Sequence, residues 1–217
     1  MTNDCKDRDL LPIEPCIFTG GGFESQQLAA GLDGVMSGTL FSSGSVDFSA
    51  AGVQPGMVLC IYSSVPAEAR AYEILSVNSG TSLTVSILRS ERDGPAVSPP
   101  AGTSLKYYIN TFAPQISAAQ STLLEKLRRI SEASGVAAAS FVDSAQFLHA
   151  VALAVLSNIF TARASNAFAD DANWVKAEFY RCQHVAAVSA LRLAKDIDGD
   201  GLAEQTRTLG NVSLRRI

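Results

Sequence analysis

A stretch rich in aspartate and glycine near the C-terminus holds the residues best suited to chemistry. Asp196, Asp198 and Asp200 alternate in a D-x-D-x-D-G pattern, and Glu204 follows. Calcium takes about six to eight oxygen ligands, and alternating carboxylates around a tight glycine turn supply several of them. The twelfth position, where a complete calcium loop has a bidentate glutamate, is Arg207, so the pattern predicts a weak calcium site. The alternative is an Asp/Gly-rich helix exit whose carboxylates accept hydrogen bonds from their own backbone amides.

Cysteine and histidine residues do not form a second site. The cysteines are Cys5, Cys16, Cys60 and Cys182. They form no CxxC pair, whereas a structural zinc site or a disulfide framework clusters its cysteines, so we interpret them as reduced thiols in a cytosolically made protein. His149 lies in an apolar stretch, and His184 is two residues from Cys182, on a different helix face. We expect both histidines in a core or an interface.

The sequence lacks the motifs of common enzyme classes. It contains no P-loop, no GxSxG nucleophile elbow and no HExxH zinc motif. Paired carboxylates for acid–base work occur only in the Asp-rich loop, which has no apolar pocket to shift a pKa. We therefore expect a protein that is not an enzyme, with calcium as the one candidate cofactor.

The composition is that of a folded protein. Of the 217 residues, 47% are hydrophobic and 18% are charged, which is sufficient for a buried core. The formal net charge of −4 argues against a protein that coats nucleic acid with its whole surface. The N-terminus is polar and acidic, unlike a secretory signal, and the longest apolar run, residues 150–156, is too short to span a bilayer. We expect a soluble intracellular product without a membrane partner.

Residues 32–112 show the two-residue period of β-strands. Apolar and polar residues alternate over 82–87, and the Asn-Ser-Gly sequence at 78–80 favours a hairpin turn before them. Four or five short strands at this spacing predict a small antiparallel β-barrel or sandwich. Before this β-domain, Pro12 and Pro15 favour an extended N-terminal segment over 1–31, with no regular element before about residue 25.

The period changes to that of α-helices from residue 113 onward. The first apolar stripe comprises Ile116, Leu123, Leu127 and Ile130. A capping box of Asp143 and Gln146 opens a second helix, on which Leu148, Val151, Val155 and Ile159 share a face. Arg128 and Arg129 near the end of the first helix suit the macrodipole there, and we interpret them as a solvated face.

A third helix follows the acidic pair Asp170-Asp171, which favours a helix N-terminus. Its apolar stripe comprises Val175, Phe179, Cys182, Ala186, Ser189 and Leu193. Together the stripes predict a three-helix bundle over 113–195. Narrow, alanine-rich stripes bury little area, so such a bundle needs a neighbour to complete its burial.

The remaining residues, 196–217, combine the Asp-rich loop with an extended tail. Alternation around Val212 and Leu214 predicts a terminal strand that must pair with another sheet edge. The predicted fold class is thus α+β: a three-helix bundle, a small antiparallel barrel or sandwich before it, and an extended C-terminal tail.

Three stretches resemble one known family. They are LPIEP at 11–15, FSAAGVQPGMVL at 48–59, and DIDGDGLAEQTR at 196–207 with its closing strand. Their order, around a β insertion and a helical bundle, resembles the head–tail connector (adaptor, or neck) proteins of tailed bacteriophages and related gene-transfer particles. The resemblance implies a virion protein, made in the host cytoplasm, that forms a twelvefold ring of copies under the portal.

In that family the ring extends the DNA channel, which DNA passes without sequence-specific binding, and links the capsid to a stopper or tail-terminator protein. The family's C-terminal segment reaches the portal. The resemblance therefore implies portal contacts by the corresponding residues here, which are Arg207, Val212, Leu214, Arg215, Arg216 and Ile217.

Two other functions remain open from the sequence. One is a calcium-dependent binding module, although 7% aromatic residues and a single tryptophan are few for carbohydrate recognition. The other is a stopper or tail-completion protein of the neck, a class dominated by β-structure. The predicted helix content favours the adaptor.

Overall fold

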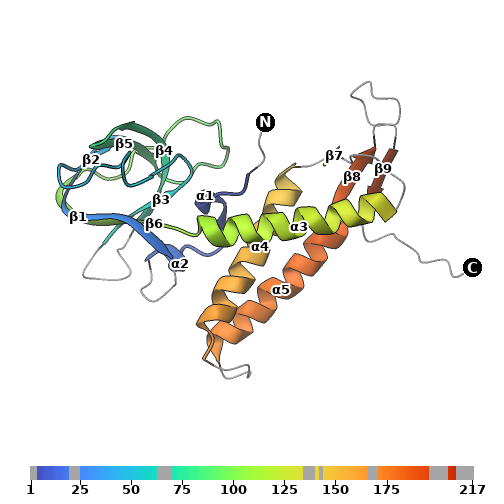
Figure 1. The fold of residues 1–217 in the computed structure, drawn as a ribbon. Coiled ribbons are helices and arrows are strands. Elements are labelled where there is room, and N and C mark those ends of the chain that lie inside the picture. The colour runs from blue at the N-terminus through green and yellow to red at the C-terminus, as the bar shows by residue number, and fades with distance from the viewer. Residues whose placement is uncertain are drawn as a thin grey trace, which may run out of the picture. The chain divides into compact units, whose positions relative to one another are not determined.

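The computed structural model describes residues 4–19, 25–62, 70–133, 140–141, 144–165, 171–195 and 205–208. The chain divides into two compact units. The barrel unit comprises residues 6–113, and the helical unit comprises residues 1–5 and 114–217. Each unit has its own buried apolar residues, and Figure 1 shows the helices and strands of both.

The barrel unit is a closed barrel of six antiparallel strands. The strands are β1 (Gln26–Ser37), β2 (Leu40–Ser42), β3 (Val58–Ile61), β4 (Arg70–Ser79), β5 (Ser82–Ser86) and β6 (Gly102–Thr111). Their order around the barrel is β1-β2-β5-β4-β3-β6, and β6 pairs with β1 to close it. The barrel therefore has no open sheet edge. Strand β1 begins at Gln26, inside the segment that the sequence predicted to be extended.

The barrel core is built around aromatic rings. Phe41 and Tyr107 meet edge to face at 4.9 Å between ring centroids, and Phe48 packs against both. Glycines give these rings room, because a Cβ at Gly31 would lie 2.6 Å from Tyr107 and one at Gly34 would lie 2.9 Å from Phe41. The alternation predicted for 82–87 is present in β5, where Leu83 and Val85 are fully buried.

The N-terminal segment differs from the prediction of an extended lead-in. It contains two short helices, α1 (Asp7–Leu10) and α2 (Cys16–Thr19), and several of its apolar residues are buried. The buried apolar residues are Leu10, Leu11, Ile17 and Phe18. Four-residue helices have no stability of their own, so packing on the barrel maintains them.

A buried ion cluster fastens this segment to the barrel. The Glu73 carboxylate on β4 lies between two guanidinium groups, with Arg8 Nη1 at 2.7 Å and Arg89 Nε at 2.6 Å. The Glu73 side chain is 1% exposed. Arg92 and Asp9 form a second ion pair beside it.

The helical unit contains three long helices, but they do not form the predicted three-helix bundle. They are α3 (Ala113–Ala133), α4 (Ser144–Arg163) and α5 (Ala172–Ala190). Helices α4 and α5 pack along each other as an antiparallel hairpin, and α3 runs across their direction (Figure 1). The prediction of a bundle was wrong because an apolar stripe on each helix fixes which side is buried and not the angle at which helices cross.

Helix α4 is the core of this unit. Residues 150–153 are four consecutive buried residues, and successive residues point about 100° apart, so every side of the helix is covered there. By length and composition alone, residues 145–163 could also cross a membrane, and half of the apolar window is buried inside the structure. We interpret α4 as a core helix.

A small antiparallel sheet completes the described part of the helical unit. Its strand order is β7 (Ser140–Phe141), β8 (Arg192–Lys195) and β9 (Gln205–Thr208). Strand β9 pairs with β8 of the same chain, and Arg207 lies opposite Leu193. Strand β9 lies at the end of the predicted Asp-rich loop, and the predicted terminal strand around Val212 and Leu214 lies outside the described residues.

Candidate protein-interaction surface

Helix α5 is fixed at its N-terminus by a capping aspartate. The Asp171 carboxylate accepts hydrogen bonds from the backbone N–H groups of Asn173 and Trp174, at 2.8 and 3.2 Å. It also accepts bonds from the hydroxyl and the N–H of Ser165 at the end of α4, both at 2.7 Å. These hydrogen bonds hold the pKa of Asp171 well below its usual range, with the Ser165 hydroxyl as the largest cause. The sequence prediction of an acidic helix start here is confirmed.

One face of α5 is attached to α4 along its length. The Ser157 hydroxyl donates to the carbonyl oxygen of Ala177 at 3.1 Å, and the Phe160 and Tyr180 rings stack at 5.7 Å. Further along, Nδ1 of His184 lies 2.8 Å from the carbonyl oxygen of Ala150. These contacts define the inner face of the helix and leave little freedom to rotate it.

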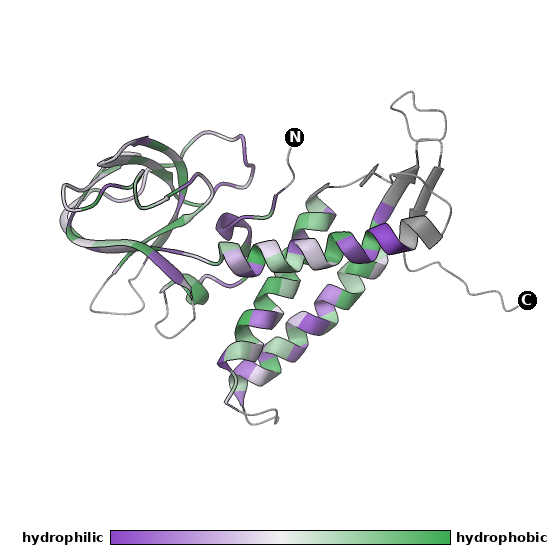
Figure 2. Ribbon diagram, viewed as in Figure 1, coloured by the Kyte–Doolittle hydropathy of each residue, from purple (hydrophilic) through white to green (hydrophobic). Residues whose placement is uncertain are grey.

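The predicted apolar stripe lies on the opposite face, except for Leu193, which lies beyond the end of α5 in strand β8. We define the α5 stripe as Val175, Phe179, Cys182, Ala186 and Ser189, and all five residues are exposed. At 100° per residue, this stripe points about 180° away from the inner face. Phe179 is 57% exposed and Val175 is 50% exposed, values that are high for side chains of their size. Figure 2 shows apolar residues along both helices of the hairpin.

The electrostatics of the stripe favour an apolar partner. None of its five side chains carries a formal charge at neutral pH. An ion pair at its border joins Glu178 and Arg181 within the helix, and this hydrogen bond lowers the pKa of Glu178. Val185, which is 57% exposed, adds apolar surface beside this border.

The stripe spans residues 175–189, which is about 21 Å of helix. Such a surface supports neither proton transfer nor metal binding. Covering it with another apolar surface lowers the free energy, because apolar area is removed from water. Its arrangement is therefore suited to binding another protein through a helix face.

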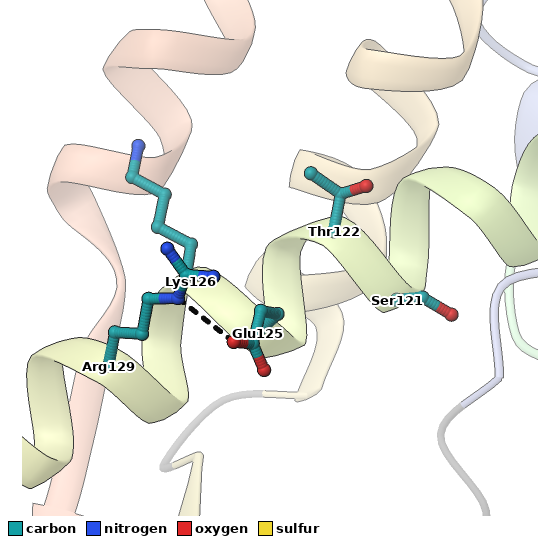
Figure 3. Close-up of a pocket in the computed structure, with 5 residues that line it drawn as sticks. All are labelled: Ser121, Thr122, Glu125, Lys126 and Arg129. Atoms are coloured by element: carbon teal, nitrogen blue, oxygen red, sulfur yellow. Dashed lines mark hydrogen bonds and ion pairs between the residues drawn. The ribbon is translucent and has the colours of Figure 1, made fainter.

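A hollow on α3 is a second surface feature (Figure 3). Its volume is about 630 Å³, and the described residues that line it come from this one helix. They are Ser121, Thr122, Glu125, Lys126 and Arg129. Glu125 accepts hydrogen bonds from Arg128 and Arg129 at 2.9 Å, which lower its pKa to about 2. The two arginines thus form ion pairs with Glu125 within α3. The sequence analysis interpreted them as a solvated face near the end of this helix.

The predicted metal site cannot be compared with the structure. Asp196, Asp198, Asp200 and Glu204 lie outside the described residues. Within the part of the chain that the structure describes, no three potential metal ligands among His, Cys, Asp and Glu come together.

The predicted portal-contact residues are only partly described. The backbone of Arg207 lies in β9, whereas Val212, Leu214, Arg215, Arg216 and Ile217 lie outside the described residues.

Sequence reasoning found the α5 stripe and assigned it to the wrong environment. It treated the stripe as part of a bundle core, whereas the inner face is formed by Ala177, Tyr180, His184 and Val188. It also placed His149 in a core or an interface, and in the single chain His149 is exposed. A hydrophobicity pattern does not mark the inner face, because that face includes Tyr180 and His184.

Comparison of this chain with models of protein families, with curated proteins and with solved structures found no match.

Proposed function

We propose that this protein is a structural subunit of a larger assembly, and specifically a head–tail adaptor of a tailed bacteriophage or a related particle. The observation that carries this proposal is the α5 stripe. A helix fixed on one face and apolar on the other is typical of a protein whose burial is completed by a neighbour.

In this proposal the neighbour is another copy of the chain in a ring under the portal. Rings use heterologous contacts, in which one face of a subunit packs against a different face of the next. The stripe supplies one such face in every copy. Arg207 and residues 212–217 would contact the portal, as the resemblance to head–tail connectors implies.

The ring would extend the DNA channel and link the capsid to the tail. DNA would pass through it without sequence-specific contacts, and the protein would act without catalysis. The overall charge of −4 supports this role, because an acidic protein holds DNA weakly and lets it slide.

A stopper or tail-completion protein of the neck is the second candidate. The observation that favours it is the closed barrel, a complete β-unit that takes up about half of the chain. Such a protein would bind the tail-side neighbour of the adaptor and not the portal.

Co-sedimentation of the full chain with purified portal rings tests the proposal. The adaptor function predicts one bound copy per portal subunit, and loss of binding when residues 212–217 are deleted. Binding only to the tail-side neck protein would favour the stopper, and binding to neither would contradict both assignments.

The same experiment with calcium and with chelator tests the Asp-rich loop. If the loop holds calcium, binding weakens in chelator, and the double variant Asp198→Asn/Asp200→Asn behaves in calcium as the native chain does in chelator. Identical binding and identical thermal unfolding in both conditions would exclude a structural calcium ion.

A further inference from the structure

The spacing of the α5 stripe indicates what kind of surface covers it. Its five residues follow one another at intervals of four, three, four and three residues. This is the heptad spacing at which two α-helices keep their facing positions together along their length. The stripe therefore fits a second helix better than it fits a sheet.

The stripe has large side chains at one end and small ones at the other. Val175 and Phe179 form its N-terminal half, and Cys182, Ala186 and Ser189 form its C-terminal half. A second α5 in the parallel direction would place Phe179 against Phe179 and Ala186 against Ala186, so the two helices could not keep an even distance. In the antiparallel direction each large side chain meets a small one, which gives close packing along the whole contact.

One antiparallel register makes all of these large-to-small contacts within the helix. In this register Val175 of each copy faces Ala186 of the other, and Phe179 of each copy faces Cys182. A shift of one heptad in one direction would place Val175 against Phe179, which are both large. A shift in the other direction would place Val175 against Leu193, which lies beyond the end of α5 in strand β8.

The charges beside the stripe are compatible with this register. Lys176 and Gln183 are exposed on the same side of the stripe. In the antiparallel register Lys176 of one copy lies beside Gln183 of the other. The two Lys176 residues are then about 13 Å apart along the helix axis, which exceeds the Debye length of about 8 Å at physiological ionic strength.

The area of the stripe determines how strong such a contact is. Half or more of the surface of Val175, Phe179 and the neighbouring Val185 is exposed. With the smaller residues of the stripe, a second helix would cover roughly 400–500 Å² of each copy, and a total of about 800–1,000 Å² is typical of weak, reversible contacts. We therefore expect paired chains at roughly 100 μM protein and single chains at about 1 μM.

We propose that the α5 stripe of the free protein binds the α5 stripe of a second copy, in an antiparallel pair with two-fold symmetry. The stripe is complementary to itself because its large half fits its small half. The contact involves only α5, and it does not depend on the proposed function.

The pair also has a consequence for assembly, and this consequence does rest on the proposed function. A two-fold contact closes at two copies, whereas a ring needs a contact between different faces of neighbouring copies. The same stripe cannot serve in both contacts at once. A paired copy must therefore separate before it joins a ring, and the small area of the contact allows this exchange.

Cross-linking between single cysteines tests the direction of the pair in the full chain. Cys16 and Cys182 are replaced by serine, and the other two cysteines are buried. Val175→Cys and Ala186→Cys are each added to this background, and the two proteins are treated with a short bis-maleimide, separately and mixed, at roughly 100 μM. In the proposed register, position 175 lies next to position 186 of the other copy. Two positions 175, or two positions 186, lie about 16 Å apart along the axis.

The mixture should give cross-linked dimers, and either protein alone should give few. A mixture of Ala186→Cys with Ser121→Cys, at an exposed position of α3 outside the stripe, is the matched control and should give few dimers. Efficient cross-linking of each protein with itself would show a parallel pair and overturn the proposal. The absence of cross-linked dimers in all mixtures would overturn it as well.

Sedimentation equilibrium tests the role of the stripe without any cysteine substitution. The proposal predicts that Phe179→Glu raises the dissociation constant of the dimer by about 30-fold or more, and that Leu124→Glu, on α3, leaves it as in the native chain. Equal dimerisation of Phe179→Glu and the native chain would contradict the proposal.

Portal rings test the consequence for assembly separately. Dimers linked between positions 175 and 186 should not bind the rings, whereas the same two proteins without linker should. Full binding of the linked dimer would contradict the exclusion of paired copies. If the native chain does not bind portal rings at all, the proposed function fails, and the cross-linking result still decides whether the pair exists.

Discussion

The two units of this protein differ in the polar groups that they bury and in the apolar groups that they expose. The barrel unit buries an ion cluster around Glu73 and closes its sheet completely. The helical unit exposes an apolar stripe along α5. The barrel also exposes apolar residues, but they are spread over β1, β2 and several loops, whereas those of α5 lie on one line of a single helix.

This difference indicates how complete each unit is. A closed barrel pairs both edges of every strand, so the barrel unit needs no neighbour to complete its sheet. When a helix has apolar residues on two opposite faces, only one of these faces is buried against the rest of the chain. We infer that the barrel unit is structurally self-sufficient and that the helical unit is completed by assembly.

The largest expected effect is at the centre of the ion cluster. Glu73→Ala leaves Arg8 and Arg89 buried without their shared carboxylate and should destabilise the barrel unit by about 3–5 kcal/mol. Denaturant unfolding followed by the NMR signals of Tyr107 reports the barrel, and fluorescence of Trp174, the single tryptophan, reports the helical unit.

In Glu73→Ala, the unfolding transition reported by Trp174 should keep the midpoint that it has in the native chain. Glu91→Gln, on an exposed side chain of the barrel unit, is the matched control and should leave both transitions unchanged. An unchanged Tyr107 transition in Glu73→Ala would show that the cluster does not hold the barrel together.

Acid should change the stabilities of the two units in opposite directions, and this effect should be smaller than that of Glu73→Ala. The folded pKa of Asp7 is raised to about 6, above its unfolded value of 3.8, so the barrel unit gains stability as pH falls. Between pH 7 and pH 5 this gain is about 1 kcal/mol. The pKa of Asp171 is lowered instead, so the stability that this cap gives to α5 is present above pH 4 and is lost below it.

Unfolding at pH 7, 5 and 3, again with separate probes for the two units, measures this difference. The Asp7→Asn variant should remove the gain of the barrel between pH 7 and pH 5 and leave the acid sensitivity of the helical unit intact. A helical unit that gains stability over the same interval would contradict the assignment.

The smallest expected effect on stability is on the α5 stripe. Phe179→Glu changes an exposed side chain and should alter the free energy of unfolding of the helical unit by less than about 0.5 kcal/mol. Thermal unfolding monitored through Trp174 checks this. A loss comparable to that of a core substitution would show that Phe179 is buried in the single chain.

Local sequence signals identified several elements of this fold. The Asn-Ser-Gly sequence at 78–80 located the turn between β4 and β5, and Asp171 located the start of α5. Both signals act within a few residues along the chain, where backbone preferences and capping dominate.

The features of the fold that the sequence did not predict depend on contacts between residues far apart along the chain. The helix α1 depends on Arg8 and its ion pair with Glu73, 65 residues further along the chain. The inner face of α5 contains Tyr180 and His184, which a hydrophobicity pattern does not select. Their burial depends on Phe160 and on the carbonyl oxygen of Ala150. The sequence thus predicted the apolar stripe that forms the candidate site, but it did not predict that the stripe is exposed.

The most direct test of the proposed assembly function is the binding of stripe variants to portal rings. Phe179→Glu is compared with Leu124→Glu, which places the same charge at an exposed apolar position on α3 outside the stripe. The proposal predicts one copy per portal subunit for the native chain and for Leu124→Glu, and loss of that stoichiometric ring for Phe179→Glu. Native stoichiometry of Phe179→Glu would contradict the assignment of the α5 stripe as the contact that completes this protein.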